Sequence, residues 1–542
     1  MATANPFSLW ILLLIAAISY PTSLLAKSDV YIVHMDLSAM PRAFADHHSW
    51  YEATLSSIKD GGNGVATITT TKPSYLIYTY NNAIHGFAAS LSPLELDLLK
   101  HLPGFVSSTL DVLLKADTTH TPDFLGLNNS NSGPWPASNY GEDVIIGLVD
   151  SGIWPESASF RDDGMTQVPN KWKGECVSGT DFNSTMCNKK LIGARFFNKG
   201  IKAHSPDLNF SMNSARDTDG HGTHTSSIAA GNYVKGASCF GYARGSARGM
   251  APKARIAMYK AMRDDTFYAS DVIAAIDKAI SDGMDVLSLS LGNTASNFYD
   301  DPIAIASVAA MEKGIFVAAS AGERGALPVH SAQCRTLATY CGASLYPGNS
   351  SLTRVPLVFM GDCNDLNNVE GKIVVCESTY LFWASADNID DQITSGAAGG
   401  IFLYVGNRIE PHIHLSFPAV VVSMEEEEGQ AIFNYINTSH DPRATMKFPY
   451  TRIGTKAAPR VAISSSRGPS TICPNILKPD LMAPGSLVLG SWSPISPIVD
   501  DDGSTQMFSD FNIIYGTSMA CPHAAGVAAL LKGAPQPFDL LS

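Results

Sequence analysis

Three short stretches of the sequence place a hydroxyl, an imidazole and a carboxylate among small residues. Ser518 lies in "GTSMACPHAAG", His221 lies in "DGHGTHTS", and Asp150 ends the apolar run "DVIIGLVD". Together these side-chain types support nucleophilic catalysis, because the hydroxyl attacks, the imidazole takes its proton and the carboxylate orients the imidazole. The small neighbours would let a substrate backbone approach closely. The three stretches therefore predict a covalent catalytic site.

Two of the three stretches also have other interpretations that stay open at this point. A serine before an apolar helix, here residues 524–531, often caps the first turn with its hydroxyl. His221 and His224 could bind a metal ion, although no third ligand follows at the spacing of a zinc protease. The run "DTDG" at 217–220 begins like a calcium loop and lacks the rest of that pattern.

His221 precedes a predicted helix of small residues. The positive end of a helix dipole favours the neutral form of an imidazole and lowers its pKa. We therefore expect His221 to be neutral near pH 7, as a general base must be.

The elements around these residues alternate between strands and helices from about residue 140 to 320. That alternation predicts a buried parallel sheet covered by helices on both faces, with ligands at the carboxyl ends of the strands. Asp150 closes its strand at such an end. The predicted strands are "DVIIGLVD", "ARIAMYKAM", "DVLSLSLG" and "GIFVAAS", and the predicted helices are "SDVIAAIDKAISDG" and "DDPIAIASVAAMEKG".

Two further regions have a different character. Residues 27–117 alternate as β-α-β-β-α-β, which predicts a small ferredoxin-like unit followed by the polar link "TTHTPDFLGLNNSNSGPWP". Residues 345–455 hold the strand-like runs "GKIVVCES", "GGIFLYV" and "PAVVVS" and a helical run in which Ser423 and Glu426 form a predicted capping box. We interpret this second region as an inserted module, after which the alternation resumes at "RVAISSSRGPS".

The composition is that of a well-packed chain, and the N-terminal segment predicts export. Charged residues make up 16%, hydrophobic residues 45%, and the net charge is −13, which argues against a nucleic-acid-binding surface. Residues 1–26 are predicted to be a secretory signal peptide; the missing positive n-region leaves an N-terminal anchor as the alternative. No other stretch is long and apolar enough to cross a membrane. We expect no membrane association after signal removal.

The cysteines agree with an oxidising compartment. Nine are present, so at least one lacks a partner within the chain. Two pairs that flank short polar loops, Cys176 with Cys187 and Cys363 with Cys376, are plausible disulfides. The sequence contains no CxxC motif, so a structural zinc site is not expected. Asn-x-Ser/Thr sequons, consistent with secretion, occur at Asn128, Asn183, Asn209, Asn349 and Asn437.

The three catalytic stretches and their order Asp…His…Ser together resemble the subtilase family, especially plant subtilisin-like proteases. The resemblance implies that Ser518 is the nucleophile, His221 the general base and Asp150 the group that orients it. It implies an α/β subtilisin-like sheet and no obligatory metal or other cofactor. The segments implied to line the substrate channel are "SLG" (Ser290, Leu291, Gly292) and "SAG" (Ser320, Ala321, Gly322).

The resemblance also implies a domain organisation. Residues 27–117 resemble an inhibitory propeptide that acts on its own catalytic domain, with the mature protein starting at Thr118. Residues 345–455 resemble a protease-associated insert, which divides the catalytic domain into 118–344 and 456–542. The implied product is a secreted serine endopeptidase of the plant apoplast or cell wall that hydrolyses protein or peptide substrates.

Two departures from the family pattern lead to an alternative. The family continues "SAG" with an asparagine that donates to the oxyanion, whereas this chain has Glu323, and residues 324–345 do not match. Family members also continue past the serine helix into a C-terminal β-domain, so we interpret this chain as truncated. The alternative function is a catalytically impaired subtilase-like protein that binds peptides or its own propeptide.

Overall fold

The computed structural model describes residues 29–59, 76–80, 86–110, 121–127, 133–205, 213–263, 266–292, 301–322, 344–348, 351–363, 366–378, 395–404, 417–423, 427–449, 461–462, 465–468, 475–476, 478–501 and 505–535. These residues fall into two compact units, Met1–Leu114 and Lys115–Ser542.

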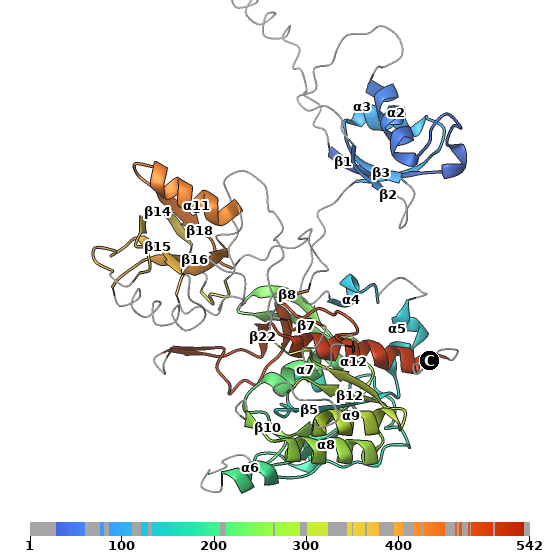
Figure 1. The fold of residues 1–542 in the computed structure, drawn as a ribbon, viewed down its shortest axis with the longest axis vertical. Helices are drawn as coiled ribbons and strands as arrows, with labels where there is room; N and C mark the ends of the chain where they lie inside the picture. The colour runs from blue at the N-terminus through green and yellow to red at the C-terminus, as the bar shows by residue number, and fades with distance from the viewer. Residues whose placement is uncertain are drawn as a thin grey trace, which may run out of the picture. The chain divides into compact units, whose positions relative to one another are not determined.

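The first unit is a four-stranded antiparallel sheet with the strand order β2-β3-β1-β4 and two helices (Figure 1). Apolar residues of β1 and β3, such as Val33 and Phe87, pack against buried residues of the helices, such as Tyr51 and Leu99. The β-α-β-β-α-β prediction is confirmed. The elements are β1 (Asp29–Met35), α2 (His47–Lys59), β2 (Leu76–Tyr80), β3 (Gly86–Leu91), α3 (Pro93–Lys100) and β4 (Phe105–Leu110).

The second unit is built on a five-stranded sheet with the order β13-β12-β5-β9-β6, in which every neighbouring pair is parallel. β5, which ends at Asp150, lies in the middle and is buried along its whole length. The predicted parallel sheet is therefore confirmed. The strands are β5 (Ile145–Asp150), β6 (Leu191–Phe196), β9 (Arg255–Lys260), β12 (Val286–Leu289) and β13 (Phe316–Ala319).

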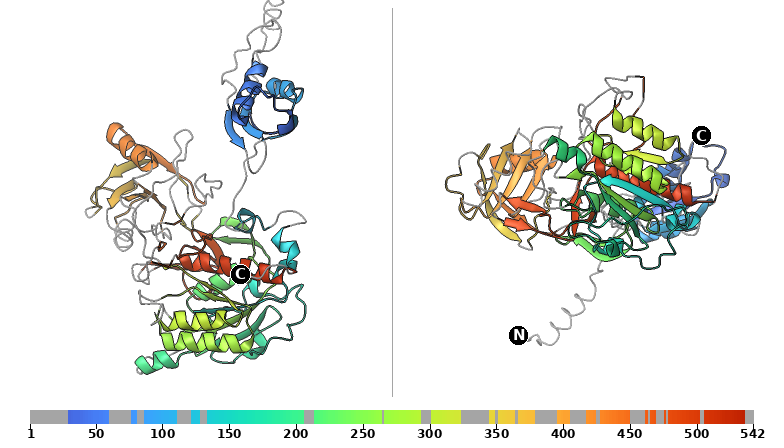
Figure 2. Two further views of the ribbon diagram at one scale, coloured as in Figure 1. Left: turned by 45° about the vertical axis from the view of Figure 1, so that its right-hand side comes forward. Right: turned by 90° about the horizontal axis from the view of Figure 1, so that it is seen from below.

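Alternate residues of β5 fill two separate cores, because successive side chains of a strand point to opposite faces. Ile146 and Leu148 pack on the side of α7 (His221–Ala230) and α12 (Thr517–Gly533). Ile145 and Val149 pack on the other side, that of α8 (Ala269–Asp282) and α9 (Pro302–Met311). Figure 2 shows the helices on both faces of this sheet. This two-sided cover explains why the strands read as continuous apolar runs.

Some sequence predictions differ from the structure. β6 (Leu191–Phe196) was not predicted, because a run that contains a glycine and an arginine gives only a weak strand signal. β13 was predicted as a buried strand, yet within the described part of the sheet it lies at the edge and Ala319 is exposed. The segments 461–462 and 465–468 carry no strand, so the resumption at "RVAISSSRGPS" is not seen there.

The region predicted as an insert forms a second five-stranded sheet with the order β17-β16-β15-β14-β18, parallel except for β18. Cys363 and Cys376 form a disulfide within it, and Cys176 and Cys187 form another in the first part of the unit, as predicted. The elements are β14 (Leu352–Phe359), β15 (Ile373–Ser378), β16 (Gly399–Tyr404), β17 (Ala419–Ser423), α11 (Glu427–Thr438) and β18 (Arg443–Met446).

The predicted capping box of α11 stays a prediction. Ser423 ends β17, and Glu426 lies outside the described residues.

Short elements complete the second unit. Two of them, β19 and β22, form an antiparallel pair that packs beside α7. They are α4 (Thr121–Phe124), α5 (Pro134–Ala137), α6 (Lys199–His204), β7 (Val234–Cys239), β8 (Tyr242–Ala247), β10 (Met262–Arg263), β11 (Thr266–Phe267), β19 (Val488–Ser491), β20 (Val499–Asp501), β21 (Thr505–Met507) and β22 (Phe511–Ile514). Among the helices described, none is long and apolar enough to cross a membrane.

Candidate active site

His221 and Asp150 are hydrogen-bonded, although 71 residues separate them in the sequence. The strand β5 delivers Asp150 at its carboxyl end, and α7 begins at His221 after Gly220, whose positive φ of 110° suits a glycine. The imidazole Nδ1 lies 2.7 Å from Asp150 Oδ1. The Thr225 hydroxyl donates to Asp150 Oδ2 at 3.0 Å, and the backbone N–H of Ser151 donates to Oδ1 at 2.7 Å. The carboxylate is therefore fixed on both oxygens.

The electrostatic environment of His221 differs from the expectation. Burial favours the neutral imidazole, but Asp150, Asp219 and Asp217 together outweigh it and raise the pKa of His221 to about 9. The prediction that the helix start keeps this imidazole neutral near pH 7 was wrong. Three carboxylates, one of them hydrogen-bonded to the ring, favour its protonated form, whereas the helix end contributes only partial charges. The protonated form of His221 is thus strongly stabilised in the free protein.

Ser518 is the second residue of α12, and its hydroxyl does not cap the helix. The N-cap position is Gly516, which makes no side-chain capping bond. The half-buried Ser518 hydroxyl instead donates to the backbone carbonyl of Ser290 at 3.3 Å, and the Ser290 hydroxyl donates to the Ser518 carbonyl at 2.8 Å. The capping interpretation is therefore wrong. A contact of 3.3 Å is long for a hydroxyl donor, so the hydroxyl is only loosely held.

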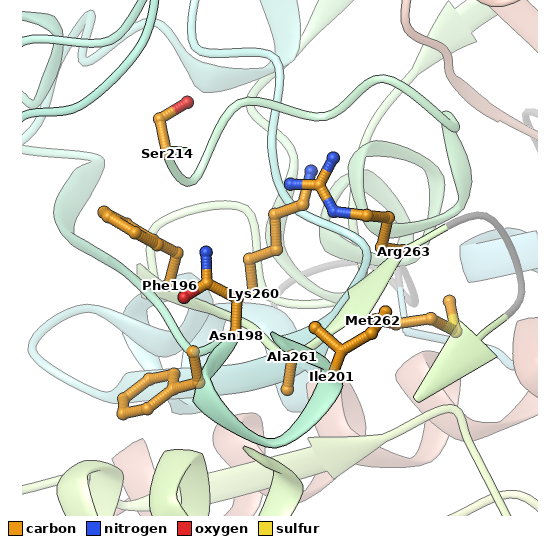
Figure 3. Close-up of a pocket in the computed structure, with 9 residues that line it drawn as sticks. Phe196, Asn198, Ile201, Ser214, Lys260, Ala261, Met262 and Arg263 are labelled. Carbon is orange, nitrogen blue, oxygen red and sulfur yellow. The ribbon is translucent and has the colours of Figure 1, made fainter. Parts of the chain in front are cut away.

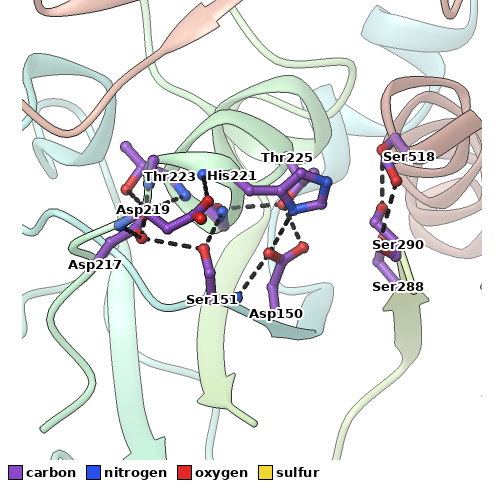
Figure 4. Close-up of polar contacts among 12 residues, drawn as sticks. Asp150, Ser151, Asp217, Asp219, His221, Thr223, Thr225, Ser288, Ser290 and Ser518 are labelled. Carbon is purple, nitrogen blue, oxygen red and sulfur yellow. Dashed lines mark hydrogen bonds and ion pairs between the residues drawn. The ribbon is translucent and has the colours of Figure 1, made fainter. Parts of the chain in front are cut away.

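Figure 4 shows the His221 ring between Asp150 and the Ser518 hydroxyl, with hydrogen bonds drawn to Asp150. Ser518 reaches the site from α12 and His221 from α7, two helices that pack against each other on one face of the sheet.

The two segments expected to line a substrate channel follow neighbouring strands. Ser290–Gly292 continues β12, and Ser320–Gly322 continues β13, at the carboxyl edge of the sheet. The Gly322 N–H donates to the Thr517 hydroxyl at 3.1 Å, immediately before Ser518. Both segments therefore lie beside the predicted nucleophile. Glu323, the predicted oxyanion position, lies outside the described residues.

The two histidines of the alternative metal interpretation are held by different partners. His221 Nδ1 bonds to Asp150, whereas His224 is fully buried with Nε2 placed to donate to the carbonyls of Val488 and Asn512 at 3.1 and 3.2 Å. Burial lowers the pKa of His224 to about 3, so it is a neutral core residue. Within the described ranges, no three His, Cys, Asp or Glu side chains are placed to hold a metal ion.

A small pocket lies at the carboxyl ends of β6 and β9 and encloses about 270 Å³, including space open to solvent (Figure 3). Asp150 pairs in register with Lys260 at the end of β9, so the pocket adjoins the strand end that carries Asp150. The Lys260 ammonium donates to the Arg216 carbonyl at 2.6 Å. The pocket is lined by Phe196, Phe197, Asn198, Ile201, Ser214, Lys260, Ala261, Met262 and Arg263.

Sequence reasoning missed the polar residues that surround the histidine. Asp217 was considered only as the start of a calcium loop, and Ser151 and Thr225 were not singled out. All three are buried and bond within the site. The sequence does hold one signal, a cluster of short polar residues next to Asp150 and His221. Such residues are seldom buried, so their place beside a predicted buried strand end points to a role in the site.

Comparison with known proteins identifies the family. The model of the subtilase family matches residues 141–538, and the model of peptidase inhibitor I9 matches residues 30–117. The chain belongs to the subtilase family. It is 44% identical to the tomato (Solanum lycopersicum) protein named Subtilisin-like protease SBT3, over 94% of this chain and 70% of that protein. It is 42% identical to Subtilisin-like protease SBT1.9 of Arabidopsis thaliana, over 94% of this chain and 71% of that protein.

These matches confirm two predictions about this subtilase. The chain is a serine-type peptidase by family, and its α/β sheet is the catalytic fold of that family. The inhibitor I9 match coincides with the ferredoxin-like unit that precedes the sheet. A third relative, Subtilisin-like protease SBT1.7 of Arabidopsis thaliana, is 39% identical over 96% of this chain and 72% of that protein.

Proposed function

We propose that this subtilase is a secreted endopeptidase in which Ser518 is the nucleophile, His221 the general base and Asp150 the residue that orients His221. The observation that carries the proposal is the 2.7 Å bond between His221 Nδ1 and Asp150 Oδ1. That bond leaves Nε2 for the serine hydroxyl, and it fixes the ring in one tautomer.

The reaction would proceed in two halves. The Ser518 hydroxyl leaves the Ser290 carbonyl and attacks the carbonyl carbon of the scissile peptide bond, while His221 Nε2 takes its proton. The oxyanion then forms near the backbone N–H of Ser518 in the first turn of α12. His221 returns the proton to the departing amine, which leaves an acyl-enzyme on Ser518. Water, activated by the same imidazole, hydrolyses the ester and restores the serine.

The raised pKa of His221 gives the proposed reaction a defined pH dependence. Only the neutral imidazole accepts the serine proton, so the rate falls as the pH decreases through the pKa of His221. Because that pKa is raised to about 9, the acid limb of kcat/KM is expected above the ordinary range of histidine near 6.5.

Secretion is part of the proposal. Two disulfides have formed, Cys176–Cys187 and Cys363–Cys376, and such bonds are rare in reducing compartments. The apolar segment at 1–26 supplies the predicted export signal. Residues 27–117, which contain the inhibitor I9 match, are proposed to inhibit the catalytic domain until they are removed.

Labelling with a fluorophosphonate tests the proposed catalytic residues. The secreted protein is expected to label, and Ser518→Ala is expected to abolish labelling while leaving the thermal unfolding transition in place. His221→Ala is expected to slow labelling by several orders of magnitude. A well-folded protein that does not label would instead support the alternative of a peptide-binding subtilase without catalysis.

A further inference from the structure

Asp217 is a buried carboxylate that accepts five hydrogen bonds at the start of α7. It is 0% exposed. Its Oδ1 accepts from the Ser151 hydroxyl at 3.0 Å and from the backbone N–H groups of Asp219 and Gly220 at 3.1 and 2.9 Å. Its Oδ2 accepts from the N–H and the hydroxyl of Thr223 at 2.9 and 2.5 Å. Both carboxylate oxygens therefore accept hydrogen bonds from groups of the protein itself.

Ser151 extends this network to the strand that carries Asp150. Its hydroxyl donates to Asp217 and accepts from the backbone N–H of Gly222 at 2.8 Å, while its own N–H donates to Asp150. Gly222 is the residue after His221. A Cβ at Gly222 would lie 2.2 Å from the Gly152 carbonyl oxygen, so strand end and helix start are in direct contact there. Figure 4 shows the network of Asp217 and Ser151 beside the His221–Asp150 pair.

We propose that Asp217 is a positioning residue for the catalytic pair: through Ser151 and the first turn of α7 it holds the end of β5 against the start of the helix. This inference rests on the proposed function. It assigns Asp217 no contact with the substrate. Its effect is geometric, because the bond between His221 and Asp150 joins one side chain from each of the two segments that Asp217 ties together.

Asp217 also adds negative charge near the imidazole. Its carboxylate is one of three that raise the pKa of His221. Titratable groups on the elements around the ring include Asp150 on β5, Asp219 on the turn before α7, His224 on α7, His523 and Cys521 on α12, and Lys260 on β9. His224 and His523 are buried and neutral, with pKa values of about 3 and about 4. Removal of the Asp217 charge should therefore lower the pKa of His221.

Asp217→Asn is the variant that tests the proposal. Asparagine keeps one acceptor oxygen but presents an NH₂ group to the Thr223 N–H, so one side of the network is lost. We expect kcat to fall by about tenfold to a hundredfold with KM nearly unchanged, since small displacements of catalytic groups have effects of this size. The acid limb of kcat/KM should move to lower pH. In the proton spectrum, the far-downfield signal of the His221 Nδ1–H should broaden or disappear.

Asp271→Asn is the matched control. Asp271 is also buried, at 4% exposed, and holds the start of the short helix α6 through the N–H groups of Gly200 and Ile201 at 2.8 and 2.9 Å. It lies outside the catalytic network. We expect this variant to lower the unfolding temperature without changing kcat, the acid limb or the downfield signal. If Asp217→Asn, like Asp271→Asn, lowers only the unfolding temperature and leaves kcat, the acid limb and the downfield signal unchanged, Asp217 merely stabilises the helix start and the proposal is overturned.

Ser151→Ala gives a second test if Asp217→Asn does not fold. It removes only the bridge between Asp217 and the Gly222 N–H, and it should weaken the downfield signal and lower kcat in the same direction. A folded Ser151→Ala protein with wild-type kcat and signal would contradict the proposal. The downfield signal does not depend on catalysis, so it separates the two hypotheses. A wild-type protein that shows the signal but does not label would contradict the proposed function and leave the role of Asp217 intact.

Discussion

We propose that the residue after Gly322, which lies outside the described residues, governs how well a negatively charged intermediate is stabilised. The Gly322 N–H bonds to the hydroxyl of Thr517, so the chain at this point lies next to Ser518. An amide side chain placed one residue further could donate to an oxyanion formed at Ser518. A carboxylate in the same place would instead add negative charge where negative charge develops.

Glu323→Asn is therefore expected to raise kcat by about a hundredfold or more, with little change in KM. The loss of one oxyanion donor costs about 2.7–4 kcal/mol of transition-state stabilisation. Glu323→Gln is the matched control, because it removes the charge but places its amide one methylene further out, and it should recover less. Steady-state hydrolysis of a peptide substrate measures both variants. Equal kcat for the unchanged chain and Glu323→Asn would show that residue 323 is not the oxyanion position.

The sequence indicates the proposed catalytic residues more clearly than the residues proposed to support them. Asp150, His221 and Ser518 stand in long motifs that a reader can compare with a known family. Asp217 and Ser151 have no such motif, because their role depends on a contact between a strand end and a helix start 66 residues apart. The prediction of a neutral His221 was wrong for a related reason. Two of the three carboxylates that raise its pKa lie in the "DTDG" turn, and the sequence alone does not show that this turn brings them near the ring.

At the scale of elements, α7 and α12 approach closely because small residues line their contact. Gly526 of α12 lies against α7, and a Cβ at that position would be 2.6 Å from the Ala229 carbonyl oxygen and 2.5 Å from Met250 Cβ. These two helices carry His221 and Ser518. The separation between the proposed base and nucleophile therefore depends on the close packing of the helices.

Gly526→Ala should push the helices apart. We expect a loss of about 1–3 kcal/mol in the free energy of unfolding from overpacking, together with a fall in kcat. Gly533→Ala on the same helix is the control, since its Cβ would meet its nearest atom, the Ser138 carbonyl oxygen, at 3.2 Å, where a small shift suffices. Urea unfolding and peptide hydrolysis measure the two effects. Unchanged stability and kcat in Gly526→Ala would show that the contact adapts without cost.

Periodicity predicted most elements because burial on both faces leaves a clear pattern. The four strands read as apolar runs were found, as were α8 and α9. β6 was not predicted because Gly193 and Arg195 interrupt its apolar run. In the structure, Arg195 forms ion pairs with Asp282 and Glu175. The partial exposure of β13 could not be predicted either, since the order of strands across a sheet is not encoded in any single strand.

At the scale of the whole molecule, the catalytic sheet is assembled from distant parts of the chain. β5 pairs with β9 and β12, which lie more than a hundred residues later, and α12 follows at the far end of the sequence. Parallel sheets with such distant pairings fold slowly, because the entropy of closing long loops is lost before the contacts form. In the first unit, the antiparallel partners of β1 are nearer in sequence than β5 is to β9 or β12, and the unit has a core of its own.

This contrast predicts that residues 27–117 assist the folding of the second unit and then inhibit it. Expression of residues 118–542 alone should give less folded protein than the full chain, and addition of 27–117 in trans should raise the yield and slow peptide hydrolysis. Leu99→Ala in the added unit should weaken both effects, because Leu99 is 0% exposed in its core and its truncation costs about 2–5 kcal/mol. Lys100→Ala, an exposed neighbour on α3, is the control and should act like the unchanged unit. A normal yield of labelled, active protein from residues 118–542 alone would refute the folding role, because a chain that reaches its active structure unaided needs no template.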